Sequence, residues 1–468
     1  MYVSHLSLLD YRSYEHVDVE FQPGINILVG QNGQGKTNLA EAIGYIATLG
    51  SHRVAADIAL IRAGAHRAMI RSRIVRGDRS QTVEIEIING KANRARVNRG
   101  TPGRAADALG ILKTVLFAPE DLVLVKGDPD ARRRFLNELT IFISPRMSSV
   151  FSDYDRVIKQ RSALLKSAIA ARKAHRELDL STLDIWDAKL ASLGAQIMAF
   201  RQRLIVALRP YVHSSYDEVS MSQSVAHIEY ESSVDAVLAD ARKLDAFRSE
   251  ELPQPDVHHT VQSIEEIEAE LLESLKIVRP RELERGVCLV GPHRDEVAMT
   301  LNNLPVKGYA SHGESWSFAL ALRLASYRLM TDGPDSQDAS DSLSQYWWTD
   351  SDVDTEPVLI LDDVFAELDS KRRRQLSRII SGARQVIITA AVMEDIPEDL
   401  GGNIFHVSAG TVVPENSLDN SDNSESINDD SLASSLPSSV SVNSGIADGA
   451  EPDQDGEDST SPLDAEDA

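Results

Sequence analysis

The stretch Gly30-Gln31-Asn32-Gly33-Gln34-Gly35-Lys36-Thr37 lies between a short apolar run at residues 25–29 and a helical pattern that begins at Lys36. The eight residues fit G-x-x-x-x-G-K-[ST], a loop whose backbone N–H groups and lysine surround a phosphate. A strand before such a loop and a helix after it direct the N–H groups and the positive end of the helix dipole at that phosphate. Chance matches are expected in only roughly 1–2% of chains of this length. The sequence therefore predicts a P-loop that binds a nucleotide through residues 30–37 and Asn38.

The composition limits the class of protein. The 468 residues are enough for two or more domains with a substantial core. The single cysteine, Cys288, excludes an internal disulfide and favours a reducing compartment. The first residues lack the pattern of a signal peptide, and no stretch approaches the ~18 apolar residues of a membrane helix. We therefore expect a cytoplasmic protein with no membrane partner.

The net charge of −24 is unevenly distributed. Residues 415–468 contain fifteen Asp and Glu and no Lys or Arg, which leaves −9 for residues 1–414. Because the remainder is not basic, any nucleic-acid surface must be a local patch. The residues after about Pro414 are rich in Ser, Asp and Asn and show no periodicity, so they are predicted to form a disordered acidic tail.

Alternating apolar residues predict an antiparallel sheet beside the P-loop. The alternation occurs at residues 3–8, 17–21 and 82–87, Asn89-Gly90 suits a hairpin turn, and residues 95–97 suit the return strand. The apolar run at residues 115–119 ends this strand-rich region, and further strands are predicted at residues 287–290, 297–301, 358–362 and 385–389.

Residues 128–285 have a mostly helical pattern. Amphipathic runs occur at residues 131–143, 147–173, 184–209 and 262–277, and Pro145, Pro210 and the pair Pro253/Pro255 are predicted to interrupt them. We therefore expect an α/β fold with a compact helical lobe (128–285) inserted between the N-terminal half (1–127) and the C-terminal half (286–413) of an ATPase head, followed by the tail (414–468). Residues 331–356, rich in Asp and Ser, are predicted to be a disordered insertion.

Residues 358–363 predict a buried strand that ends in two carboxylates. A strand of this kind beside a P-loop delivers a Mg²⁺ ligand, the Walker B aspartate, so Thr37 and Asp362 are predicted to share Mg²⁺ while Lys36 reaches the β- and γ-phosphates. Asp363 is a candidate general base for the attacking water. Many related ATPases have Glu there, and the shorter Asp predicts slow hydrolysis. Taken alone, the pattern also fits an ordinary strand that runs into an acidic turn.

Ser311-His312-Gly313-Glu314 precedes another helical run. Ser311 suits a helix N-cap, and Gly313 permits close backbone approach. The segment fits either a plain helix cap or a second site that binds a γ-phosphate.

Several segments resemble known ATPases. The P-loop, residues 311–314, the Walker B strand and Ala366-Glu367-Leu368-Asp369 occur in the order of ABC-type ATPases, whose D-loop the last segment resembles. The closer resemblance is to the RecF family of bacterial recombination mediators, and it covers residues 1 to about 410. It is carried by Ser51-His52-Arg53, Phe117-Ala118-Pro119-Glu120-Asp121-Leu122, Lys159-Gln160-Arg161, Gly291-Pro292-His293-Arg294-Asp295 and Leu361-Asp362-Asp363-Val364-Phe365.

The resemblance implies an ATP-dependent homodimer. Ser311, Gly313 and Glu314 of one copy would close on ATP held by Lys36 of the other, and Asp369 would belong to the D-loop. It also implies binding to duplex DNA and gapped junctions, action with RecR and RecO, promotion of RecA loading, and slow, DNA-stimulated hydrolysis. One departure from the ABC pattern is that Thr389-Ala390-Ala391 stands where the switch histidine is usual.

Three basic clusters are candidates for DNA contact. They are Arg132-Arg133-Arg134, Lys159 with Arg161 and Lys166, and residues 371–374. Each also fits a solvated helix face. Since no aromatic residues interleave with them, we expect contact with phosphates that does not depend on base sequence.

Other classes of protein remain open. The ATPase subunit of an ABC transporter shares the four core motifs, and stimulation of hydrolysis by duplex DNA separates it from a repair protein. An SMC-type ATPase with coiled-coil arms needs sustained heptads, which the proline-interrupted lobe does not offer. A structural DNA-binding protein has no need of Lys36 and Asp362, and a small-molecule kinase leaves residues 311–314 unexplained.

Overall fold

A six-stranded sheet carries the P-loop in this computed structural model, which describes residues 1–175, 181–220, 224–249, 261–334 and 356–418. Its strand order is β15-β14-β3-β13-β12-β8, and all neighbouring pairs are parallel except β14 and β15. The strands are β3 (Gly24–Val29), β8 (Thr114–Phe117), β12 (Val358–Asp362), β13 (Gln385–Ala390), β14 (Asn403–Ser408) and β15 (Thr411–Pro414). Every residue of β12 and β13 is buried, as the continuous apolar runs predict for strands covered on both faces.

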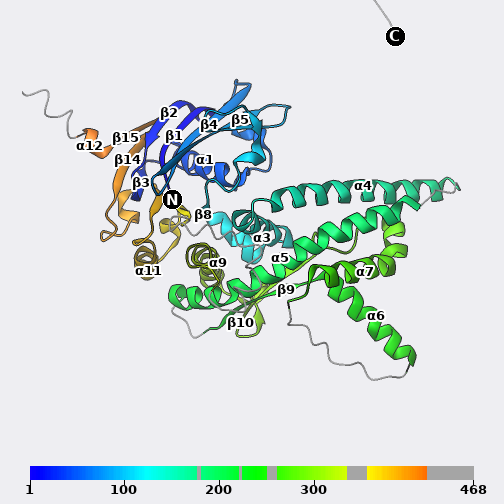
Figure 1. Ribbon diagram of the computed structural model, residues 1–468. Helices are drawn as coiled ribbons and strands as arrows, with labels where there is room; N and C mark the ends of the chain where they lie inside the picture. Colours follow the sequence, from blue (N-terminus) through cyan, green and yellow to red (C-terminus); the bar gives the residue numbers. More distant parts are fainter. Residues whose placement is uncertain (176–180, 221–223, 250–260, 335–355, 419–468) are drawn as a thin grey trace, which may run out of the picture. The chain divides into compact units, whose positions relative to one another are not determined.

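The predicted antiparallel sheet is confirmed. Its order is β2-β1-β4-β5-β6-β7, and α1 (Lys36–Thr48) contacts both this sheet and the parallel one (Figure 1). The strands are β1 (Tyr2–Tyr11), β2 (Tyr14–Glu20), β4 (Arg67–Arg76), β5 (Arg79–Ile88), β6 (Arg94–Val97) and β7 (Gly103–Arg104). The 3-10 turns η1 (Asp57–Leu60), η2 (Ala105–Ala108) and η3 (Pro119–Asp121) lie in the connections of this half.

The helical part contains α2 (Leu122–Lys126), α3 (Pro129–Ile143), α4 (Met147–Lys173), α5 (Ser181–Ser220), α6 (Ser233–Ser249) and α7 (Ile264–Arg285). Helices α4, α5 and α7 contact one another and lie side by side in Figure 1. The predicted helix at 147–173 has the observed bounds. Among the described residues, no helix is long and apolar enough to cross a membrane.

The prediction that Pro210 ends a helix is wrong, because α5 continues through it to Ser220. Beyond the proline, Tyr211 Oη donates to the carbonyl of Gly333 at 2.7 Å, and the ring of Tyr216 packs 5.9 Å from that of Phe318. This packing of the last turns offsets the roughly 3 kcal/mol that an interior proline costs a helix.

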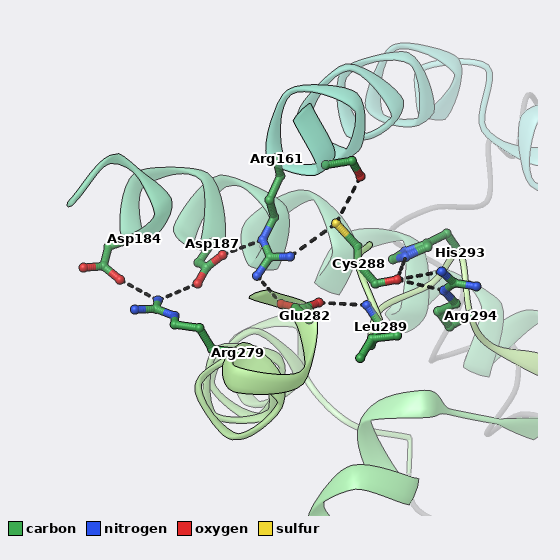
Figure 2. Close-up of polar contacts among 10 residues, drawn as sticks. Arg161, Asp184, Asp187, Arg279, Glu282, Cys288, Leu289, His293 and Arg294 are labelled. Atoms are coloured by element: carbon green, nitrogen blue, oxygen red, sulfur yellow. Dashed lines mark hydrogen bonds and ion pairs between the residues drawn. The ribbon is translucent and has the colours of Figure 1, made fainter. Parts of the chain in front are cut away.

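The strand predicted at 287–290 is also absent. Gly286 ends α7 in the left-handed conformation, and side chains satisfy the backbone that follows. The N–H of Leu289 donates to Glu282 Oε1 at 2.7 Å, and the carbonyl of Cys288 accepts from Arg294 (Figure 2). These polar groups therefore need no neighbouring strand.

A three-stranded sheet, β11-β10-β9, was not predicted. It pairs β9 (Ala226–Glu231) with β10 (Glu296–Leu301), and β11 (Leu304–Pro305) follows. The ladder joins residues on both sides of the predicted boundary at 285. Residues 1–420 also cluster as one unit, so the division into head and lobe remains a prediction.

The C-terminal half of the head contains α8 (Val306–Tyr309), α9 (His312–Asp332), η4 (Phe365–Glu367), α11 (Ser370–Ile380), η5 (Met393–Asp395) and α12 (Glu415–Leu418). Helix α12 lies within the predicted tail, so residues 415–418 of that tail are helical. The rest of the tail and residues 335–355 of the predicted insertion lie outside the described residues.

Candidate functional site

The P-loop joins β3 to α1 and contains two glycines that admit no side chain. A Cβ on Gly30 would lie 2.1 Å from the carbonyl oxygen of Val407 in β14. Gly35, the N-cap of α1, has φ 110, and a Cβ there would lie 2.5 Å from the hydroxyl of Tyr14. Both positions require glycine because the backbone passes against neighbouring groups.

Lys36 is buried within the loop. Its Nζ donates to the carbonyl oxygens of Gly30 at 2.6 Å and Gln31 at 3.1 Å. Burial lowers the pKa of Lys36 below its ordinary value, although the charges of Asp363 and Asp362 oppose this shift. The structure thus places the ammonium group at the loop, where a phosphate can replace the two carbonyls as its partner.

The P-loop and the end of β12 meet at Asp362. Thr37 Oγ1 donates to Asp362 Oδ1 at 2.9 Å, and Thr389 Oγ1 in β13 donates to the same oxygen at 2.7 Å. A hydroxyl beside a carboxylate is a donor set that suits Mg²⁺, which takes its remaining ligands from substrate phosphates and water. No group of three or more His, Cys, Asp or Glu side chains suited to a metal occurs in the described part of the chain, and a magnesium site of this kind does not require one.

Asp363 directly follows the strand and has a left-handed backbone, with φ 53. Burial, and next the charge of Asp362, raise the pKa of Asp363, while Lys36 acts in the opposite direction. A raised pKa suits a carboxylate that accepts a proton. The role of Asp363 as general base stays a prediction.

Residues beside α1 form a polar network that the sequence reasoning did not assign. Arg12 donates to both carboxylate oxygens of Glu41, at 2.8 and 2.6 Å, and Ser51 also donates to Glu41. Burial favours the neutral acid, but the hydrogen bonds from Arg12 and Ser51 outweigh it and lower the pKa of Glu41. Asn38, predicted to bind ATP, donates to Ser13 Oγ and accepts from Arg53. For part of this network, Ser51 and Arg53, the resemblance of residues 51–53 to the RecF family was the one sequence feature that pointed to a functional role.

Residues 311–314 form a helix cap. Ser311 Oγ accepts from the N–H of Glu314 at 3.2 Å, and Glu314 Oε2 accepts from the N–H of Ser311 at 2.8 Å. The predicted cap is confirmed, and its second role at a phosphate stays a prediction. The structure also brings the predicted D-loop to this cap: Asp369 caps α11 and pairs with Arg372 at 3.0 Å, and Arg372 lies beside Gly313.

Two predicted DNA contacts are wrong because the side chains are buried and paired. Arg132 donates to both oxygens of Glu296 at 2.6 Å. Arg161 is fully buried and donates at 2.6 Å to Asp187 and to Glu282 (Figure 2). Arg133 is partly buried and donates to the carbonyl of Asp295 and to Asp130.

Arg134 and Lys159 are exposed, so these two of the five predicted DNA contacts are available to a partner. Arg134 also lines a cavity of about 270 Å³ between α1, α3 and α9. In the Gly291–Asp295 segment, Asp295 is buried and accepts hydrogen bonds from Tyr230 and from the N–H and hydroxyl of Ser233.

Known proteins resemble the chain over most of its length. The model of the RecF/RecN/SMC N-terminal domain matches residues 2–400. The DNA replication and repair protein RecF of Beutenbergia cavernae is 50% identical over 418 residues, which cover 88% of this chain and 99% of that protein. RecF of Frankia alni is 51% identical over 413 residues, with the same coverage. A solved structure of the recombination mediator protein RecF-ATPrS in the RecFOR pathway has 23% identity and a TM-score of 0.72, and the match covers 88% of this chain and 98% of that one.

Proposed function

Because this chain belongs to the RecF family, we propose that it is an ATP-dependent DNA-binding protein of recombinational repair and replication restart. The observation that carries the proposal is the hydrogen bond between Thr37 and Asp362, which joins two motifs 325 residues apart in the chain. A P-loop hydroxyl beside a strand-end carboxylate is the arrangement that P-loop ATPases use to hold magnesium and ATP.

The backbone of residues 30–37 and the side chain of Asn38 contribute to ATP binding in this proposal. Lys36 neutralises the β- and γ-phosphates, Thr37 and Asp362 hold Mg²⁺, and Asp363 accepts a proton from the attacking water. Mg²⁺ supplies charge stabilisation at the phosphates when it is bound. We infer slow hydrolysis because the carboxylate of Asp363 is one methylene shorter than the glutamate of many related ATPases.

A second copy of the chain completes the site. Ser311 provides a hydroxyl and Gly313 a backbone N–H at the positive end of α9, and Glu314 holds the cap in place. Asp369 lies near this cap because its partner Arg372 lies beside Gly313. ATP held by Lys36 of one copy thereby links it to residues 311–314 of the other. RecR, RecO and RecA are the further partners, a proposal supported by the family and by the RecFOR pathway named for the structural relative.

Duplex and gapped DNA contact the exposed basic residues, Arg134 and Lys159. Phosphate contact of this kind is steeply salt-dependent and indifferent to base sequence. One alternative function, an ATPase subunit of a transporter, gives no such dependence on gapped duplex. The other, an SMC-like repair ATPase with coiled-coil arms, needs sustained heptads.

The test is sedimentation velocity with ATP and Mg²⁺, with and without a gapped duplex, on the wild type and Lys36→Arg. We expect the wild type to dimerise with ATP and to bind the duplex, and the variant to remain monomeric. A wild type that stays monomeric and ignores DNA in ATP would overturn the proposal. Dimerisation without any response to DNA would favour the transporter alternative.

A further inference from the structure

Thr389 contacts both acidic residues at the end of β12. The parallel ladder of β12 and β13 pairs it with Asp362. Its Oγ1 donates to Asp362 Oδ1 at 2.7 Å and accepts from the backbone N–H of Asp363 at 3.0 Å. We propose that Thr389 is a positioning residue of the ATPase site, which sets the direction of both carboxylates; this rests on the function proposed above.

The single donor proton of the Thr389 hydroxyl is used by Asp362. Thr389 is 1% exposed, and a hydroxyl has a single proton to donate. Because that proton goes to Asp362 and a lone pair accepts from Asp363, the hydroxyl is not available to a nucleotide. In the segment where ABC ATPases have a switch histidine, the side chain of Thr389 therefore acts on the two acids.

Each acid depends on Thr389 for a different reason. Asp362 Oδ1 also accepts from Thr37, a residue that the proposed function assigns to Mg²⁺. When Thr37 gives up that bond, Thr389 is the remaining hydrogen-bond donor to Oδ1 of Asp362 among the described residues, while the imidazole Nε2 of His52 lies 3.7 Å from Oδ2. Asp363 has φ 53, a conformation that residues with side chains rarely adopt, and its N–H is held by Thr389. The direction of its carboxylate follows from this backbone.

The matched variants are Thr389→Val, which removes the hydroxyl but keeps the shape, and Thr389→Ser, which keeps the hydroxyl. Thr140→Val is the control, because Thr140 is fully buried in α3 and its hydroxyl has no hydrogen-bond partner among the described residues. We expect Thr389→Val to lower kcat about 10- to 100-fold, since a hydrogen bond to a charged group is lost, and to change the Kd for ATP measured without Mg²⁺ less than about threefold. Thr389→Ser and Thr140→Val should retain the wild-type kcat.

Two readouts do not require hydrolysis. The Mg²⁺ concentration that gives half-maximal tightening of a fluorescent ATP analogue should rise about tenfold in Thr389→Val. In urea unfolding of the free protein, Thr389→Val and Asp362→Asn should be non-additive because the two side chains share a hydrogen bond.

The proposal is overturned if Thr389→Val keeps the kcat and the Mg²⁺ response of the wild type. It is also overturned if Thr389→Ser loses as much kcat as Thr389→Val, or if the effects of Thr389→Val and Asp362→Asn on the free energy of unfolding are additive. A wild type without ATPase activity would contradict the proposed function instead, and the unfolding cycle would still decide the role of Thr389.

Discussion

Lys159 and Arg161 show that two basic residues of one short motif can have separate roles. A helix turns about 100° per residue, so residues two apart lie on nearly opposite faces. In α4, Lys159 faces solvent, whereas Arg161 is fully buried between Asp187 and Glu282. Arg161 joins α4 to α5 and α7, and Arg279 extends the network by pairing with Asp187 (Figure 2). The burial of each side chain, and not its charge, therefore decides which residue of the motif can contact DNA.

Arg161→Met is expected to lower the free energy of unfolding by about 3–5 kcal/mol, because it leaves the buried carboxylate of Glu282 without its cationic partner and leaves Asp187 with Arg279 alone. Lys159→Ala should change it by less than about 0.5 kcal/mol and should weaken binding to duplex DNA at low salt. Urea unfolding and fluorescence anisotropy with labelled duplex measure the two effects. Equal stability of Arg161→Met and the wild type would contradict the structural role.

His293 gives the molecule a defined response to pH. Burial lowers the pKa of His293 to about 4, from an ordinary value of 6.5. Its Nδ1 lies 2.8 Å from Tyr154 Oη. A histidine with a depressed pKa stays neutral in the folded state while the unfolded chain takes up a proton below pH 6.5. The contribution of neutral His293 to the free energy of unfolding is therefore complete above pH 6.5 and is lost as the pH falls toward 4.

The free energy of unfolding of the wild type should fall by about 1–3 kcal/mol more than that of His293→Gln between pH 7.5 and pH 4.5. Urea unfolding at several pH values measures the difference in slope, which does not depend on the absolute stability of the variant. Parallel slopes for the two proteins would show that His293 titrates normally in the folded state.

At the scale of elements, α5 connects the helical part to the head. It contacts α3, α4, α7 and β9 on the helical side, and α9 and α11 on the side of the head. At 1.5 Å per residue its 40 residues span about 60 Å. Pro210 is exposed within this helix, while Leu208 and Val212 on either side are buried. Tertiary contacts therefore hold a helix that local preference opposes.

Pro210→Ala is expected to raise the free energy of unfolding by about 1–3 kcal/mol, because it restores a backbone donor inside α5 and removes the clash of the ring with the preceding turn. Pro129→Ala is the control: Pro129 is the first residue of α3, where no intrahelical donor is needed. Thermal or urea unfolding gives both values. If Pro129→Ala raised the free energy of unfolding as much as Pro210→Ala, the missing donor and the ring clash inside α5 would not be the cause of the gain.

At the scale of the whole molecule, the C-terminal segment carries most of the net negative charge. The total is −24, while residues 1–414 carry only −9. Residues 419–468 contain no Lys or Arg, so we predict that they compete with DNA phosphates for basic side chains such as Lys159.

Deletion of residues 419–468 is expected to tighten binding to gapped duplex at least about threefold at low salt, with a smaller effect at 0.3 M salt because screening weakens both interactions. Anisotropy titrations at two salt concentrations measure this, and unchanged ATP binding is the control. The idea fails if the deletion leaves DNA affinity unchanged at low salt.

Local patterns in the sequence determined the P-loop, the Walker B strand, the Ser311 cap and the antiparallel sheet. The loop, the cap and the individual strands each depend on residues that are neighbours in the chain, whose periodicity and backbone preferences are visible in the sequence, although β1 of the antiparallel sheet pairs with the distant β4. Only the tertiary structure decided that Thr389 lies against Asp362, that Arg161 is buried, that α5 passes through Pro210 and that β9 pairs with β10. These features depend on strand register and on packing between segments that are distant in the chain. The free energies of such long-range contacts cannot be read from local sequence patterns.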